Sequence, residues 1–172
     1  QYAEAEAEVG KLGPPSLNTF ERARTHQMYA AIAAAQLKPQ KAREHFQQAL
    51  AVEALPPAEQ ARVRYQIAQL YLGESKWPEA IENLKQWFAV AEEKPAGGYY
   101  LLALAYHQMG GIGQAGAAAQ QAVDLTPTPQ EAWLQLLLAI RLTKASNAED
   151  DAQRAQLYKG AEPVMTELLR RY

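Results

Sequence analysis

The chain has 172 residues, a length that suits one domain or one short repeat array. Hydrophobic residues make up 48% and charged residues 21%, which argues against a wholly disordered chain. The net charge of −2 excludes a strongly basic nucleic-acid-binding surface, and the absence of cysteine excludes disulfides, zinc ribbons and thiol catalysis. No apolar stretch approaches 18 residues, so no membrane insertion is expected.

The composition predicts an all-α protein. Alanine occurs 34 times and glutamine 18 times, whereas valine, isoleucine and threonine together occur 17 times. Helices favour alanine, leucine and glutamine, and strands favour β-branched residues. So much alanine also predicts helices that approach one another closely.

The first predicted helix covers residues 2–12, and Pro14-Pro15 then breaks the chain. Asn18 and Glu21 have the spacing of a capping box, so a second helix is expected to begin there. Residues 2–12 have the layout of the second helix of a hairpin that lacks its first.

Three helical hairpins follow in register, at 19–57, 61–95 and 96–129. In the third, two helical turns from Tyr99 to Tyr106 end at Gly110-Gly111, and a second helix runs on until Pro127. At a shift of 35 residues, the second hairpin has Ile67, Ala68, Tyr71 and Ala80 where the third has Leu102, Ala103, Tyr106 and Ala115. In the first hairpin the equivalent residues are Tyr29, Ala30 and Ala42, followed by Phe46 and Ala49.

A fourth hairpin is predicted at 130–172, where Trp133 occupies the position of Tyr99. Its second helix is expected to begin at Tyr158-Lys159-Gly160-Ala161, about 12 residues late. We therefore predict an insertion at about 145–156, read as a loop because of its polar residues. Both ends of the chain look cut within an array, which suggests a fragment of a longer repeat protein.

These large, small and aromatic positions at a 34-residue period resemble the tetratricopeptide repeat, and the resemblance covers nearly the whole of 1–172. It implies one array of stacked antiparallel helix-turn-helix units that forms an all-α, right-handed superhelix. Trp87 stands where this repeat prefers alanine, so we predict a buried indole that packs near Gly97 and Gly98.

In this family the first helices line a concave groove that binds peptides. The resemblance places these residues in the groove: Arg24, Gln27, Ala31, Arg62, Tyr65, Gln69, Leu72, Tyr100, Leu104, His107, Gln108, Glu131, Leu134, Leu138 and Arg141. Tyrosines, leucines and amides would form an amphipathic strip for a helix or an extended segment. Leu134 and Leu138 have an alternative interpretation, as core residues covered by a neighbouring helix.

The family members that bind chaperone tails hold a terminal carboxylate with asparagine and basic side chains. Here the asparagine positions are Ala31, Gln69 and Leu104, so that activity is not expected.

No catalytic, cofactor or metal site is predicted. The three histidines, at 26, 45 and 107, never have the three- or four-residue spacing of a helical metal pair. Residues 110–113 follow a helix instead of a strand, and therefore form an inter-helix turn and not a phosphate loop.

A narrower resemblance rests on residues 70–72, 77–80, 84–89, 133–138 and 168–172. These segments are similar to bacterial envelope tetratricopeptide proteins found with TonB energy-transduction systems. That likeness implies a periplasmic, non-catalytic accessory, with the cytoplasm as the alternative location.

We therefore predict a non-enzymatic scaffold that binds a protein or peptide partner on its concave face. One alternative is a structural role, with self-association through the exposed ends or the Trp87/Phe88 surface. Another is an interaction module of a larger multidomain protein, whose catalytic domain would lie outside 1–172.

Overall fold

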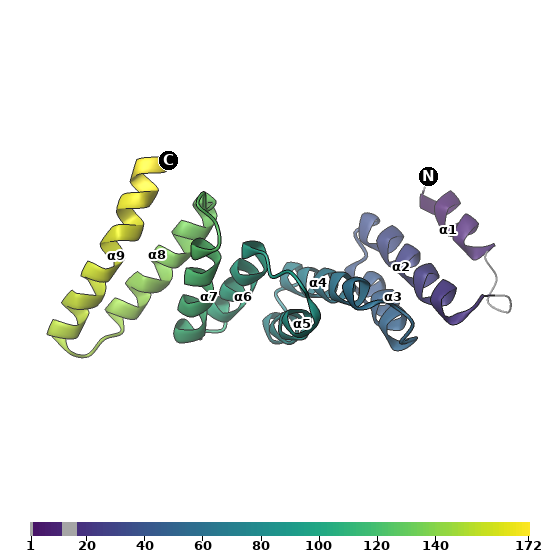
Figure 1. Ribbon diagram of the computed structural model, residues 1–172, viewed down its shortest axis with the longest axis horizontal. Coiled ribbons are helices and arrows are strands. Elements are labelled where there is room, and N and C mark those ends of the chain that lie inside the picture. Colours follow the sequence, from purple (N-terminus) through teal and green to yellow (C-terminus); the bar gives the residue numbers. More distant parts are fainter. Residues whose placement is uncertain (1, 12–16) are drawn as a thin grey trace. The chain divides into compact units, whose positions relative to one another are not determined.

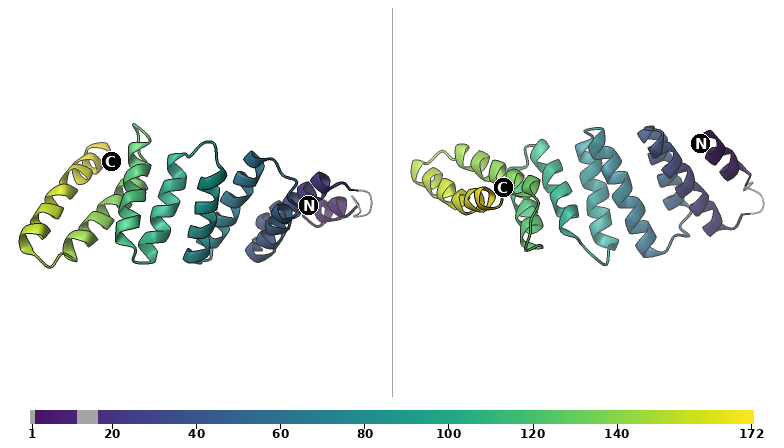
Figure 2. Two further views of the ribbon diagram at one scale, coloured as in Figure 1. Left: turned by 60° about the horizontal axis from the view of Figure 1, so that its bottom comes forward. Right: turned by 90° about the horizontal axis from the view of Figure 1, so that it is seen from above.

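A computed structural model of the protein describes residues 2–11 and 17–172, and within these ranges the chain is helical and has no strand (Figure 1). The helices are α1 (Tyr2–Gly10), α2 (Thr19–Ala35), α3 (Pro39–Ala51), α4 (Pro57–Gly73), α5 (Trp77–Val90), α6 (Ala96–Gln108), α7 (Ile112–Asp124), α8 (Glu131–Ser146) and α9 (Asp151–Arg171). Helices α2 and α3, α4 and α5, α6 and α7, and α8 and α9 pair as hairpins, as the views in Figure 2 show.

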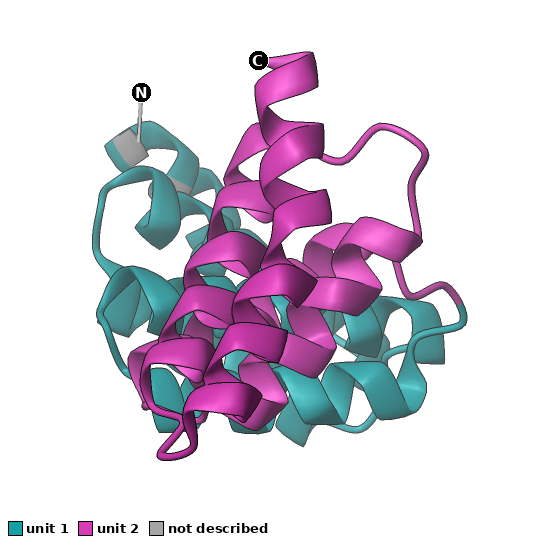
Figure 3. Ribbon diagram, turned by 90° about the vertical axis from the view of Figure 1, so that its left-hand side faces the viewer, with its two compact units in different colours: residues 1–92 teal, residues 93–172 magenta. Residues whose placement is uncertain are grey.

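The chain divides into two compact units, Gln1–Glu92 and Glu93–Tyr172 (Figure 3). Unit 1 holds α1 to α5 and unit 2 holds α6 to α9. Each has a hydrophobic core of its own, centred on residues such as Phe46 and Ile67 in unit 1 and Leu137 and Ile140 in unit 2.

Alanine provides much of the buried surface in both units. Ala68 and Ala80 in unit 1, and Ala103 and Ala115 in unit 2, have no exposed surface, as their repeat positions predict. Because a methyl group keeps the backbones close, the paired helices approach tightly. The half-buried ring of Tyr106 packs against the core of unit 2, in the space-filling role expected of it.

The start of α2 is the capping box that the sequence predicts. The Asn18 side chain accepts a hydrogen bond from the Glu21 amide at 2.9 Å, and the Asn18 amide donates to the Glu21 carboxylate at 2.8 Å. The predicted break at Pro14-Pro15 lies outside the described residues. Before it, α1 packs on α2, and Val9 is buried.

The first three hairpins turn in the same way. Leu37, Ser75 and Gly110 each have a positive φ, of 58°, 57° and 74°. In each turn the amide of the following residue donates to the carbonyl five residues before it, as from Lys38 to the Ala33 carbonyl at 2.9 Å. This is the Schellman arrangement, for which glycine is the usual residue. Leu37 adopts it with a side chain that is 88% exposed.

The predicted loop at about 145–156 is wrong, because residues 151–156 are helical. Helix α8 ends at Ser146 and α9 begins at Asp151, so four residues connect them. The polar run contains its own helix start, because the Asp150 carboxylate accepts from the Gln153 amide at 2.6 Å. Residues 158–161 consequently lie inside α9, and Pro163 interrupts its hydrogen bonds without ending it.

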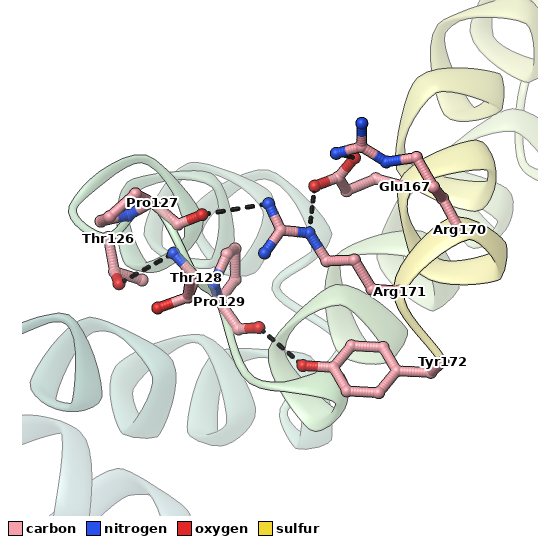
Figure 4. Close-up of polar contacts among 8 residues, drawn as sticks. All are labelled: Thr126, Pro127, Thr128, Pro129, Glu167, Arg170, Arg171 and Tyr172. Atoms are coloured by element: carbon pink, nitrogen blue, oxygen red, sulfur yellow. Dashed lines mark hydrogen bonds and ion pairs between the residues drawn. The ribbon is translucent and has the colours of Figure 1, made fainter.

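The C-terminal end of α9 is fastened to the loop between α7 and α8 (Figure 4). The Arg171 guanidinium donates to the Pro127 carbonyl at 3.0 Å, and the Tyr172 hydroxyl donates to the Pro129 carbonyl at 3.0 Å. Glu167 pairs with both Arg171 and Arg170, and the hydrogen bond from Arg171 is the main cause of its lowered pKa. These contacts fasten the end of the fourth hairpin to the loop that follows the third hairpin.

In unit 1, a buried arginine joins α3 to the end of α4. Arg43 is 7% exposed, lies 4.6 Å from the centre of the Tyr71 ring and pairs with Glu74. Lys76 adds a second contact to Glu74, at 3.0 Å. The hydrogen bond from Arg43 is the main cause of the lowered pKa of Glu74. A charge at this depth is tolerated because its partner and an aromatic face surround it.

We predict that Leu137→Ala lowers the free energy of unfolding of unit 2 by about 3 kcal/mol, because Leu137 is 2% exposed and truncation leaves a cavity. Urea denaturation followed by circular dichroism measures this loss. Leu125→Ala is the matched control, and should change stability by less than about 0.5 kcal/mol because Leu125 is 50% exposed. Equal losses for the two variants would contradict the assigned core.

Candidate functional site

In unit 1, three predicted binding residues meet at one carboxylate that the sequence analysis missed. Arg24 donates to Glu59 at 2.7 Å and to the Gln27 side chain at 3.0 Å. Gln27 also donates to Glu59 at 3.4 Å, and Arg62 lies 3.9 Å from it. The resemblance did not include Glu59, although it stands three residues before Arg62 and therefore on the same side of α4.

This cluster brings α2 and α4 together and leaves its arginines accessible. The side chains of Arg24 and Arg62 are 45% and 60% exposed, whereas that of Glu59 is 23% exposed. Two guanidinium groups share one carboxylate, so a positive charge faces the solvent here. We call the surface formed by Arg24, Gln27, Glu59, Arg62 and Gln69 the α2/α4 face.

Gln69 is exposed near the other end of α4. It lines a pocket of about 300 Å³ together with Ala34, Leu37, Pro39, Leu70, Gly73 and Glu74. The pocket lies between the α2–α3 turn and the end of α4, and the small residues that line it leave room for a side chain. Leu72, another predicted binding residue, is half-buried.

Tyr65 is half-buried against Trp87, with ring centres 4.9 Å apart, and Trp87 lies 4.6 Å from Phe88. Burial raises the pKa of Tyr65. Trp87 is 6% exposed, so the predicted burial of its indole is confirmed. Its proximity to Gly97 and Gly98 would join the two units and stays a prediction.

In unit 2 the predicted residues of α6 lie on one side of that helix. The Tyr100 ring lies 5.9 Å from that of Trp133 in a stacked arrangement, and Leu104 and His107 are half-buried. Gln108 is exposed. The Nδ1 atom of His107 is buried and has no hydrogen-bond partner among the described residues. We call this set, with Tyr100, Leu104, His107 and Gln108, the α6 face.

Two of the residues predicted on α8 have other roles. Leu134 is 1% exposed in the core that Val164 of α9 also enters, so the alternative interpretation holds and Leu134 cannot contact a partner. Arg141 donates to the Gly160 carbonyl on α9 and to Gln120 on α7, so it fastens helices together. Leu138 packs half-buried against the same core, and Glu131 is exposed.

A histidine pair, also missed by the sequence analysis, joins α2 to α3. The Nδ1 atoms of His26 and His45 are 3.3 Å apart, with ring centres at 5.6 Å. The Tyr29 ring stacks on the His45 ring, with ring centres 5.1 Å apart. Burial is the first cause of the lowered pKa of His26, followed by the charges of His45 and Arg22. A search for pairs within one helix could not detect residues 19 positions apart.

Within residues 2–11 and 17–172, no group of three or more histidine or acidic side chains is arranged to hold a metal ion. None of the helices in these ranges combines the length and the apolar character that a membrane crossing requires.

No family model matches the sequence, and no curated protein matches it. Solved structures do. A double mutant of MamA from Desulfovibrio magneticus RS-1 has a TM-score of 0.70 at 20% identity, over 96% of this chain and 86% of that one. The C-terminal part of a TPR repeat-containing protein from Cytophaga hutchinsonii also has a TM-score of 0.70, at 13% identity over 96% and 62% of the two chains.

The Sgt2 TPR domain from Aspergillus fumigatus has a TM-score of 0.59 at 19% identity, over 80% of this chain and 90% of that one. The chain has the fold of tetratricopeptide-repeat proteins. The predicted fold class is thereby confirmed, at identities that establish the fold alone.

We predict that acid weakens unit 1 through His26. Because the folded state lowers the pKa of His26 below its usual value of about 6.5, the folded protein binds fewer protons than the unfolded chain. The free energy of unfolding therefore keeps its full value above pH 6.5 and decreases as the pH falls from 6.5 through the lowered pKa. His26→Gln should therefore reduce the change in urea midpoint between pH 7.5 and 5.5. His107→Gln is the control, and an unchanged pH response in His26→Gln would contradict the assignment.

Proposed function

We propose that the protein is a non-catalytic scaffold that binds a protein or peptide partner through the α2/α4 face of unit 1 and the α6 face of unit 2. The observation that carries the proposal is the cluster at Glu59, which holds Arg24, Gln27 and Arg62 on one accessible surface of two consecutive first helices. Solved structures with this fold include domains named for the tetratricopeptide repeat, and the resemblance in sequence assigns partner binding to these same positions.

The α2/α4 face offers both polar and apolar contacts. Arg24 and Arg62 present hydrogen-bond donors already aligned by Glu59, so a partner loses little side-chain entropy on meeting them. The pocket beside Gln69 accepts an apolar side chain of the same partner segment. Tyr65 packs on Trp87 and is only half-buried, so the exposed part of its ring remains available to a partner.

The experiment is affinity capture from an extract of the source cells with two charge-matched variants. The first, Arg62→Glu/Gln69→Glu, reverses the charge of the α2/α4 face. The control, Lys41→Glu/Gln48→Glu, makes the same charge changes on exposed positions of α3. We expect a partner that binds the wild type and the control alike, and the first variant at least tenfold more weakly, about 1.4 kcal/mol. Equal retention by all three proteins would reject this face.

A second candidate function, self-association, is favoured by α9. Tyr158, Met165, Leu169 and Tyr172 recur at intervals that place them on one stripe of the helix, and they are 42%, 46%, 76% and 63% exposed. Exposed apolar side chains gathered on one stripe of a helix mark a surface that packs against another protein surface. The Trp87/Phe88 surface is a weaker alternative, because Trp87 is buried.

For this candidate we predict that the mass of the wild type rises with concentration in sedimentation-equilibrium runs. Met165→Glu/Leu169→Glu should remain monomeric, because it places two charges on the stripe. Met109→Glu/Leu125→Glu changes exposed residues elsewhere in unit 2 and should behave as the wild type does. A wild type that is monomeric at every concentration would eliminate self-association through α9.

We also propose a role as an accessory of a bacterial envelope complex, with the periplasm as its location. The support is the sequence resemblance of residues 70–72, 77–80 and 84–89 to envelope proteins found with TonB systems. Fractionation of the source cells separates this location from the cytoplasm.

A further inference from the structure

We propose that His26 and His45 form a two-histidine site for a divalent zinc ion, which clips α2 to α3. The geometry points to this assignment. Both histidines present Nδ1 toward the other, and the two nitrogens are 3.3 Å apart. One lies on the first helix and the other on the second helix of the same hairpin, so an ion bound by both would connect the two.

The separation of the nitrogens suits four-coordinate zinc. Zinc–nitrogen bonds of about 2.0–2.1 Å at the tetrahedral angle place two ligand nitrogens about 3.3–3.4 Å apart. Neighbouring ligands of a square-planar ion would be closer, at about 2.9 Å for similar bond lengths. The observed separation of 3.3 Å matches the tetrahedral arrangement.

The surroundings hold the two ligands ready. The centre of the His45 ring lies 5.1 Å from that of Tyr29 and 5.6 Å from that of His26, and these contacts restrict its rotamers. Both histidines are half-buried, so solvent and ions reach them.

The chain supplies two ligands, and water occupies the other two positions of the ion. Structural zinc sites have four protein ligands and catalytic sites have three, so an ion held by two is bound more weakly and exchanges with free zinc. Arg22, whose charge acts on His26, is exposed, so solvent screens its repulsion of the ion. The site is therefore filled reversibly, according to the concentration of free zinc.

The test is a titration of the whole chain with zinc chloride at pH 7.5, in buffer free of chelating agents, followed by calorimetry. We expect one zinc ion per chain for the wild type and for His107→Gln. Affinity should fall at least tenfold in His26→Gln and equally in His45→Gln, because each removes one of two ligands. Circular dichroism establishes that the variants keep their helical content.

Long-range proton–nitrogen correlation spectra of the wild type give a second readout that needs no variant. Zinc should shift the Nδ1 resonances of His26 and His45 and leave those of His107 unchanged. Equal zinc affinity in all four proteins, or Nδ1 resonances that do not respond, would overturn the proposal and leave a hydrogen bond as the whole content of the pair. Neither result depends on the partner-binding face.

Discussion

Close contact between helices through alanine is the interaction on which the rest of this structure depends. Fully buried alanines occur in every helix from α2 to α8. A methyl group contributes little buried area, so one hairpin gains too little free energy to fold alone, and stability has to come from stacking on its neighbours. The few large, fully buried side chains, such as Ile67, Leu84 and Leu137, fill the spaces that alanine leaves.

Close packing through alanine also determines which side chains lie on the surface. When alanine covers the inner sides of the helices, the long polar side chains are directed outward, where they bind one another across helices. Arg24 and Glu59 join α2 to α4, and Arg141 joins α8 to both α7 and α9. Exposed ion pairs of this kind add little to stability, and their greater effect is to fix the positions of charges. A surface with fixed charges is suited to selecting a partner.

Local signals made most of the fold predictable from the sequence. Asn18 and Glu21, Pro39, Pro78 and Gly110 each determine a helix end through their own backbone chemistry, without reference to distant residues. The errors arose where a distant contact or a competing local signal decided the outcome. Asp150 caps α9, which begins seven residues before the expected position.

The candidate site was less predictable for a related reason. Positions carried over from the repeat assume that every first helix has the same neighbours. This assumption does not hold for Leu134, which is buried in a core that includes Val164 of α9. It does not hold for Arg141 either, because that side chain donates hydrogen bonds to Gly160 and Gln120. Glu59 and the His26–His45 pair depend on contacts between helices, and no spacing along one helix contains that information.

The α2/α4 face and the α9 stripe differ in physical character, and this difference separates their functions. The α2/α4 face consists of aligned charges in contact with solvent, so its attraction for a partner is screened as ionic strength rises. The α9 stripe consists of apolar side chains, and salts that are excluded from protein surfaces strengthen their burial. Both surfaces are present on one chain, so a scaffold that gathers copies of itself and a scaffold that binds a charged partner respond to salt in opposite directions.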